Sequence, residues 1–437
     1  MSAVASLVDA LRAELVRSDV EVAEGSAWPG VSAEAEAVVH PATTEQVAAT
    51  MRLASAHGVG VLVVASGERL HRSRRAEEPF VVLCTDRLSG IDIYEPADLT
   101  LTAGAGTPLR TLAAELHANR QWLPYDPPHA DARSLGGLVA TGESGPLCMG
   151  YGELRNHVLG LTLVTGDGRV LELGGRVVKN VAGFDLLKPV VGSRGRLGVI
   201  TSACVRAFPE PARERLLALG ADTPSALLAA ARAIGTAPVM PVSCVLVAGL
   251  AGESGARLLV RLHGAETTVE ADRKTLERHC AATFDVVEDG GATSRAARDH
   301  ATSGDLVLTI SVLPSRLGAA LAAVDELLGP CALAVETYRG TIRVSARAED
   351  APRVARLRAR VEALGGALGA RAGRGAGAFF PDAGGDGVQV ANPVDRDVDR
   401  SVDPRALGSG VPAGAAALTR SLEQVFDPKG VLWPCRP

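Results

Sequence analysis

Short apolar runs and alternating segments dominate the first half of the chain. Residues 61–65 and 80–83 are almost uninterrupted apolar runs, which are typical of buried strands. Residues 91–94 and 99–103 alternate between apolar and polar positions, as half-buried strands do. We therefore expect sheets in this half, with turns and helices between the strands.

Two helices are predicted among these strands. The first begins at Thr43 or Thr44, because either side chain can cap it, and ends at His57, where glycines follow. The second covers residues 109–121. A Gly-Asp-Gly turn at 166–168 lies between two strand-like segments and predicts a β-hairpin.

The pattern repeats itself between residues 212 and 373. Each half contains a strand, a helix, two strands and a second helix, in that order. The predicted helices of the two halves are 225–234, 265–279, 316–328 and 351–364. Two such β-α-β-β-α units predict ferredoxin-like halves that share one antiparallel sheet.

Composition narrows the possible functions. The chain has 437 residues, a net charge of −5 and only 3% aromatic residues, so neither a basic field nor a stacking surface points to nucleic acid. Its seven cysteines form no C-x-x-C pair and none has ligand spacing from a histidine, so we expect reduced thiols, no metal site and no iron–sulfur cluster in this chain.

No segment of the sequence predicts membrane insertion. Charged residues interrupt the first 20 positions, which predicts an amphipathic helix in place of a signal peptide. No uncharged apolar run reaches the ~20 residues that a membrane span needs. We expect a cytoplasmic protein, which could lie at the inner face of the membrane through its partners.

The densest glycine pattern covers residues 134–145, S-L-G-G-L-V-A-T-G-E-S-G. A backbone without Cβ atoms allows a large ligand to approach, and its N–H groups can bind phosphate oxygens. The segment is therefore either part of a cofactor-binding site or an ordinary glycine-rich loop, and the strings that follow it favour the first. Two further strings follow it, K-N-V-A-G-F-D-L at 179–186 and G-S-R-G-R-L-G-V-I-T at 192–201.

The order and spacing of these strings resemble the FAD-binding oxidoreductases of the PCMH superfamily. Within that superfamily they are most similar to the smaller flavin subunits (GlcE-type) of bacterial glycolate oxidase. The resemblance covers residues 38–211, is weak across the repeat and returns at residues 426–432, F-D-P-K-G-V-L. It implies an α+β fold in which a PCMH-type (VAO-like) two-subdomain FAD-binding domain is followed by a ferredoxin-like antiparallel cap domain.

The implied organisation has five segments. They are an N-terminal helix at 1–32, the FAD-binding domain at 33–211, the cap at 212–373, a flexible Gly/Asp/Pro-rich segment at 374–415, and a C-terminal helix and tail at 416–437 that return to the FAD-binding domain.

The resemblance also implies which residues contact the FAD. Gly136 and Gly137 would lie against the pyrophosphate, Thr141, Ser144 and Gly145 near the ribityl chain or flavin, and Pro127 near the ring. The complete set of implied cofactor-binding residues is Ser66, Gly67, Pro127, Ser134, Leu135, Gly136, Gly137, Thr141, Ser144, Gly145, Gly150, Tyr151, Gly152, Gly198, Val199 and Ile200.

Three departures from the family pattern bear on function. The loop at 64–70 keeps a single glycine, Gly67, and places Glu68 where the family has Thr or Ser. A carboxylate is unfavourable beside a diphosphate unless it points away or pairs with a neighbouring arginine such as Arg69. Near the end of the chain, Trp433 stands where the family has Asn. The cap histidines, His263, His279 and His300, are isolated and form no base or metal cluster, so no catalytic residue is predicted.

These features favour an FAD-binding subunit of a glycolate-oxidase-like complex, which oxidises a 2-hydroxy acid to a 2-oxo acid. Its implied partners are a catalytic FAD subunit and an iron–sulfur subunit. Two alternatives stay open. One is a structural subunit that kept the fold and lost the FAD, and the other is a stand-alone FAD-dependent oxidoreductase acting on a hydroxy acid or alcohol.

Overall fold

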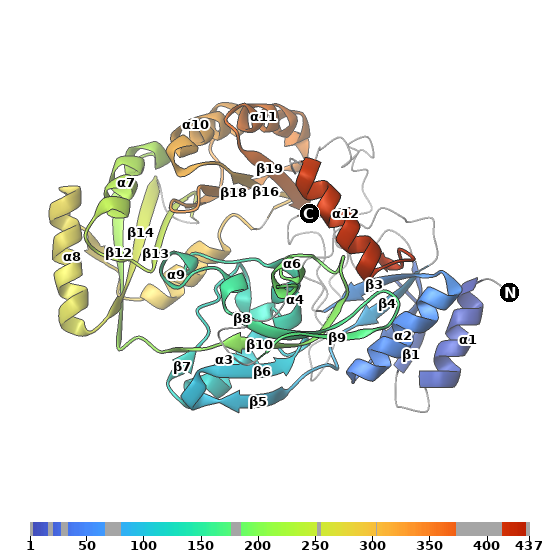
Figure 1. The fold of residues 1–437 in the computed structure, drawn as a ribbon. Helices are drawn as coiled ribbons and strands as arrows, with labels where there is room; N and C mark the ends of the chain where they lie inside the picture. Colours follow the sequence, from blue (N-terminus) through green and yellow to red (C-terminus); the bar gives the residue numbers. More distant parts are fainter. Residues whose placement is uncertain are drawn as a thin grey trace, which may run out of the picture.

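A computed structural model describes most of the chain, namely residues 3–15, 21–27, 34–65, 80–175, 185–250, 255–302, 304–372 and 413–433. Three larger sheets organise these residues (Figure 1), and a fourth sheet has only two strands, Gln121–Trp122 and Phe208–Pro209. Two five-stranded sheets come mainly from the first half of the chain, and an eight-stranded sheet comes from the repeat. No helix among these residues is long and apolar enough to cross a membrane.

The first sheet has the strand order β1-β2-β4-β3-β20, and its last four strands are parallel. Their bounds are β1 Glu21–Ala27, β2 Glu34–His40, β3 Gly60–Val64, β4 Phe80–Cys84 and β20 Leu432–Trp433. Helices α1 (Ala3–Leu15) and α2 (Thr44–His57) cover one face, where Leu7, Met51 and Val81 share a core. Apolar positions on one face of each strand explain this packing.

Helix α2 shows how local sequence sets an element's ends. Thr43 is the N-cap, since its side chain accepts a hydrogen bond from the Gln46 N–H and the Gln46 side chain accepts one from the Thr43 N–H. Gly58 ends the helix with a φ of 65°. The predicted helix is confirmed, and of the two candidate caps, Thr43 and Thr44, the structure has Thr43.

The second sheet is antiparallel throughout, in the order β5-β6-β10-β8-β9. Its strands are β5 Ile91–Glu95, β6 Thr100–Gly104, β8 Val158–Val164, β9 Val170–Gly174 and β10 Val199–Arg206. The predicted hairpin is confirmed as β8 and β9, which pair from Val164 and Val170 onward. The helix predicted at 109–121 is shorter in the structure, where α3 covers Leu109–His117. Arg120 then has a φ of 54°, and the chain turns into β7 (Gln121–Trp122).

The repeat folds into one sheet with the order β15-β12-β14-β13-β17-β18-β16-β19. Its strands are β12 Arg213–Ala221, β13 Ser243–Ala248, β14 Ala256–Gly264, β15 Asp285–Val286, β16 Leu306–Ser311, β17 Leu333–Glu336, β18 Thr341–Ala346 and β19 Ala367–Ala372. The halves meet where β13 pairs with β17. The predicted pair of β-α-β-β-α units is therefore confirmed.

The eight-stranded sheet has two different faces. Its outer face carries α7 (Leu228–Thr236), α8 (Glu266–Cys280), α10 (Leu317–Leu328) and α11 (Ala351–Ala363) (Figure 1). Side chains such as Leu258, Ile342 and Val344 pack beneath these helices. The inner face lies toward the other two sheets. Part of it is covered by α9 (Gly290–Asp299), a helix that the hydrophobic pattern did not predict.

The end of the chain packs against both small sheets. Helix α12 (Ala413–Phe426) places Phe426 in the core of the second sheet. The Asp427 carboxylate then accepts hydrogen bonds from the N–H groups of Val431 (2.9 Å) and Leu432 (2.8 Å). This turn directs β20 alongside β3 in the first sheet. Most of the predicted flexible segment, residues 374–412, lies outside the described residues.

Candidate cofactor-binding site

Most of the glycine-rich segment forms a helix, which rules out the alternative that it is an ordinary loop. Helix α4 (Leu135–Thr141) begins after Ser134, whose Oγ accepts a hydrogen bond from the Gly137 N–H at 3.2 Å. Gly142 ends it in the left-handed conformation, with a φ of 61°. The N-cap serine and C-terminal glycine are normal helix boundaries, and packing stabilises a seven-residue helix that contains two glycines.

Gly136 lies at the contact between α4 and the end of β6. Its N–H donates to the Ala105 carbonyl oxygen at 2.7 Å, and the Leu135 N–H donates to the Thr107 carbonyl oxygen at 2.9 Å. A Cβ on Gly136 would lie 2.5 Å from the Cβ of Ala105. Close packing inside the domain therefore explains this glycine, and its N–H already has a partner.

Gly137 occupies a different environment, although it is the next residue. It is partly exposed, and a Cβ there would lie 3.7 Å from the Cβ of Ala65, at the end of β3. The first turn of α4 thus faces the point where the predicted pyrophosphate loop starts. Ser66 and Gly67 of that loop, like Glu68, lie outside the described residues.

The segment after α4 brings several predicted residues together. Gly145 packs on the backbone of Asp126, which precedes Pro127, since a Cβ on Gly145 would lie 1.7 Å from the Asp126 carbonyl oxygen. Asp126 Oδ1 also accepts a hydrogen bond from the Leu147 N–H at 3.0 Å. Ser144 is partly exposed, and its carbonyl oxygen accepts from Arg339 Nη1 of the cap at 3.4 Å.

These positions fit a large cofactor. Thr141 and Ser144 have small, partly exposed side chains, and Gly137, which has none, lies beside the end of β3. Such a surface allows a planar or phosphorylated ligand to approach the backbone closely. The end of β3 belongs to the first sheet and α4 packs against the second, as expected for a ligand held between subdomains.

Other predicted residues lie elsewhere in the domain. Gly150 and Tyr151 belong to α5 (Cys148–Tyr151) and contact the cap, where a Cβ on Gly150 would lie 2.7 Å from the Cα of Val242. Gly152 follows with a φ of 89°. Gly198 precedes β10, in which Val199 and Ile200 pair with β8. Cofactor contacts at these positions stay predictions.

A group of charged residues lies where the inner face of the cap sheet meets the segment around Asp126. We call Asp126, Arg261, Glu336 and Arg343 the interdomain charged cluster. Ile342 and Val344 point to the cap helices, so Arg343 between them points to the inner face. Arg343 is 5% exposed, and its Nη2 lies 3.4 Å from Glu336 Oε1. Among the described residues its Nε has no hydrogen-bond acceptor.

Burial shifts the protonation of Asp126. Burial raises the pKa of Asp126 to about 7, and the charge of Glu336 also raises it, while the Leu147 N–H and Arg261 oppose the rise. A carboxyl group with a pKa near neutrality can accept or release a proton under ordinary conditions. No sequence pattern pointed to this residue, because its charged neighbours come from distant strands.

The three cap histidines are held in separate places. His263 Nδ1 lies 2.8 Å from the Tyr151 hydroxyl, and its Nε2 lies 3.3 Å from Glu214 Oε2. Burial alone would raise the pKa of Glu214, but hydrogen bonds from His263 and Arg261 lower it to about 2. His300 Nε2 lies 2.7 Å from the Ala248 carbonyl oxygen, and His279 is in the last turn of α8.

Comparison with known proteins identifies the domain around α4. Residues 35–174 match the family described as FAD binding domain. These residues are an FAD-binding domain of the PCMH type. The match includes β2 to β9 and all of α4, and it confirms the predicted α+β fold class and FAD as the cofactor.

Curated relatives each match roughly half of the chain. Glycolate oxidase subunit GlcE of Escherichia coli (strain K12) is 39% identical over 188 residues, which are 43% of this chain and 51% of that protein. D-lactate dehydrogenase of Archaeoglobus fulgidus is 34% identical over 189 residues, 43% of this chain and 42% of that protein. Glycolate oxidase subunit GlcD of Bacillus subtilis (strain 168) is 29% identical over 267 residues, 58% of this chain and 57% of that protein. The chain thus spans about half the length of these relatives.

Solved structures extend the similarity of the fold to the cap domain. Alkyldihydroxyacetonephosphate synthase superposes with a TM-score of 0.72 at 16% identity, covering 99% of this chain and 85% of that one. p-Cresol methylhydroxylase superposes with a TM-score of 0.70 at 15% identity, covering 99% of this chain and 96% of that one. At such identities the likeness concerns the fold alone.

Proposed function

We propose that this chain is the FAD-binding subunit of a glycolate-oxidase-like complex that oxidises a 2-hydroxy acid to a 2-oxo acid, accessory to a catalytic flavin subunit. An iron–sulfur subunit would be its further partner, and contact with a membrane would occur only through these partners. Relatives named as glycolate oxidase subunits and as D-lactate and D-2-hydroxyglutarate dehydrogenases support the substrate class.

One observation carries the accessory role. The FAD-binding domain is joined to a cap in which each described histidine is separate from the other two, and His263 is already bonded to Tyr151 and Glu214. Removing the hydroxyl proton of a 2-hydroxy acid calls for a base within hydrogen-bond reach of it. In this proposal the partner subunit supplies that base.

This chain would hold and orient the cofactor. Gly137 and the end of β3 would lie against it, and the small residues after α4 would line its other part. When bound, FAD would supply the capacity to accept electrons and pass them on. The contact between Arg339 and the Ser144 carbonyl oxygen ties the cap to this segment.

The interdomain charged cluster favours a second candidate, a stand-alone hydroxy-acid oxidoreductase. The buried guanidinium of Arg343 has an N–H without an acceptor among the described residues, and such a group binds carboxylates well. Asp126, with its raised pKa, would serve as the proton acceptor nearby.

Purification of the chain alone and with its co-purifying partners tests these proposals. The accessory role predicts a yellow isolated chain that does not oxidise glycolate or D-lactate with an artificial electron acceptor, and a native complex that does. Turnover by the isolated chain would reject the accessory role and support the second candidate. A chain that stays colourless after FAD is added would contradict both and indicate a structural subunit.

A further inference from the structure

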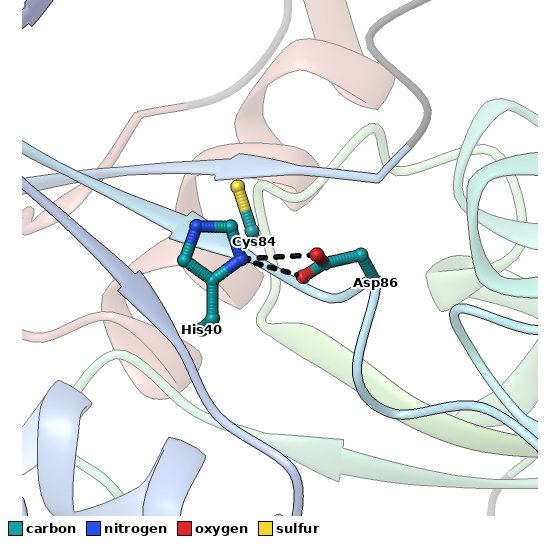
Figure 2. A group of neighbouring side chains, drawn as sticks. All are labelled: His40, Cys84 and Asp86. Carbon is teal, nitrogen blue, oxygen red and sulfur yellow. Dashed lines mark hydrogen bonds and ion pairs between the residues drawn. The ribbon is translucent and has the colours of Figure 1, made fainter. Parts of the chain in front are cut away.

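Three potential metal ligands meet at one edge of the first sheet, although they are distant in sequence. His40 is the last residue of β2, Cys84 is the last residue of β4, and Asp86 follows two residues later (Figure 2). Strands β2 and β4 are parallel, and Val39 pairs with Leu83. The same register makes His40 and Cys84 lateral neighbours whose side chains share a face.

The geometry of the three side chains is close to that of a metal site. His40 Nδ1 lies 2.9 Å and 3.0 Å from the two carboxylate oxygens of Asp86. One ligand atom from each residue, including Cys84 Sγ, lies within 4.8 Å of the others. It is the one such group of three found among the described residues.

Bond lengths to zinc show how little must move. Zinc lies about 2.0–2.1 Å from nitrogen and oxygen ligands and about 2.3 Å from sulfur, so tetrahedral ligand atoms are about 3.3–3.6 Å apart. The nitrogen–oxygen distances are already close to this range. Bringing Sγ into it requires a shift of about 1 Å or a little more, which side-chain rotation provides.

Burial gives the group a rigid side and an open side. Cys84 is 2% exposed and lies within the sheet, whereas 52% of the Asp86 side chain is exposed. A cation could therefore enter past Asp86 and reach a thiol and an imidazole that their strands hold in place. The mixture of sulfur, nitrogen and oxygen ligands selects zinc-like cations over magnesium or calcium, which prefer oxygen ligands alone.

We propose that Cys84 Sγ, a ring nitrogen of His40 and a carboxylate oxygen of Asp86 bind a zinc-like divalent cation. Water would occupy the fourth position. This site is separate from the proposed oxidation of a hydroxy acid and does not depend on it.

The site would brace the junction of the two subdomains. Thr85 lies between Cys84 and Asp86, and a Cβ on Gly106 would lie 2.0 Å from the Thr85 carbonyl oxygen. Ala105, next to Gly106, is the residue on which Gly136 packs. A cation that fixes Thr85 would thus stabilise the surface against which α4 rests, because binding to the folded state alone raises stability.

Titration of the chelator-treated full-length chain with Co²⁺, followed by Zn²⁺, tests the proposal. We expect one equivalent of Co²⁺ to give the thiolate-to-cobalt absorption band and the visible bands of tetrahedral cobalt, and Zn²⁺ to displace it. Cys84→Ser should abolish the thiolate band. The matched control Cys331→Ser, at a partly exposed cysteine in the cap, should retain it.

A second variant keeps the test independent of the buried cysteine. Asp86→Asn changes a half-exposed side chain and should fold normally, while weakening Zn²⁺ binding at least about tenfold. Zn²⁺ should also raise the melting temperature of the wild type and of Cys331→Ser, but not of Cys84→Ser. The proposal is overturned if the thiolate band is absent from the wild type, if it survives in Cys84→Ser, or if Asp86→Asn binds Zn²⁺ as tightly as the wild type. The three residues would then be a hydrogen-bonded His–Asp pair beside an ordinary buried thiol.

Discussion

The neighbouring residues Gly136 and Gly137 should respond in opposite ways to the same added methyl group. In Gly136→Ala the new Cβ would lie 2.5 Å from the Cβ of Ala105 and 2.9 Å from its carbonyl oxygen. Carbon atoms in contact are normally about 3.5–4.0 Å apart, so α4 must move by about 1 Å. Overpacking of this kind costs about 1–3 kcal/mol, and the better helix propensity of alanine returns about 0.5–1 kcal/mol. We expect a net loss of about 1–2 kcal/mol in the free energy of unfolding.

In Gly137→Ala the new Cβ meets more open surroundings. It would lie 3.0 Å from Ser134 Oγ and 3.7 Å from the Cβ of Ala65. The slight crowding and the gain in helix propensity are of similar size, so stability should change by less than about 1 kcal/mol. The methyl group instead occupies the side of α4 that faces the end of β3, where the FAD should lie. We expect the dissociation constant for FAD to rise about tenfold, which corresponds to about 1.4 kcal/mol.

Urea denaturation of the FAD-free chain and fluorescence titration with FAD measure the two effects separately. Normal FAD affinity in a folded Gly137→Ala variant would refute the placement of the cofactor beside this turn. An unchanged unfolding midpoint in Gly136→Ala would refute the packing argument for Gly136.

Three further substitutions test the charged groups between the domains. The raised pKa of Asp126, about 7, means that the folded state loses stability as pH rises from about 4 to about 7. The difference in the free energy of unfolding between Asp126→Asn and the wild type should therefore shift by about 2–4 kcal/mol in favour of the variant between pH 4 and pH 8, as measured by urea denaturation. The lowered pKa of Glu214, about 2, means that its stabilising effect is lost as pH falls from about 4.5 to about 2. In acid denaturation, Glu214→Gln should not show this loss of stability, which is about 1–3 kcal/mol in the wild type. If the variant and the wild type unfold at the same pH, the ion pairs of Glu214 with Arg261 and His263 do not stabilise the fold. If the chain itself binds the substrate, as the second candidate requires, Arg343→Met should weaken the binding of oxalate at least about tenfold, as followed by flavin absorbance, whereas Arg347→Met, at an exposed arginine further along the chain, should not. Equal affinities would remove Arg343 from the carboxylate site.

Local signals were sufficient for much of the fold. The cap at Thr43, the glycine at 58 and the turn at 166–168 each act within a few residues, so the helix and hairpin that they delimit were predicted correctly. The repeat was found because each half recovers the same order of strands and helices. Hydrophobic periodicity shows which face of each helix or strand is buried, and these elements could be predicted from it without knowledge of long-range contacts.

Contacts between distant segments explain what the sequence could not show. Helix α4 has weak intrinsic propensity, and its packing on Ala105 decides its conformation. Asp126 acquires its raised pKa from burial and from residues on strands of the cap. The potential ligands His40 and Cys84 become neighbours only through the register of two parallel strands. Each case depends on pairing information that spacing along the chain does not contain.

The pairing of β20 with β3 imposes an order on synthesis and folding. Val61 emerges from the ribosome long before its partner, Leu432, so β3 has an unpaired edge while the cap domain is being made. An exposed parallel edge invites pairing with other chains. The edge of β3 at Val61 and Leu62 is therefore covered only once β20 has been made. Until then this edge is open to pairing with other chains, so truncation before β20 should promote aggregation.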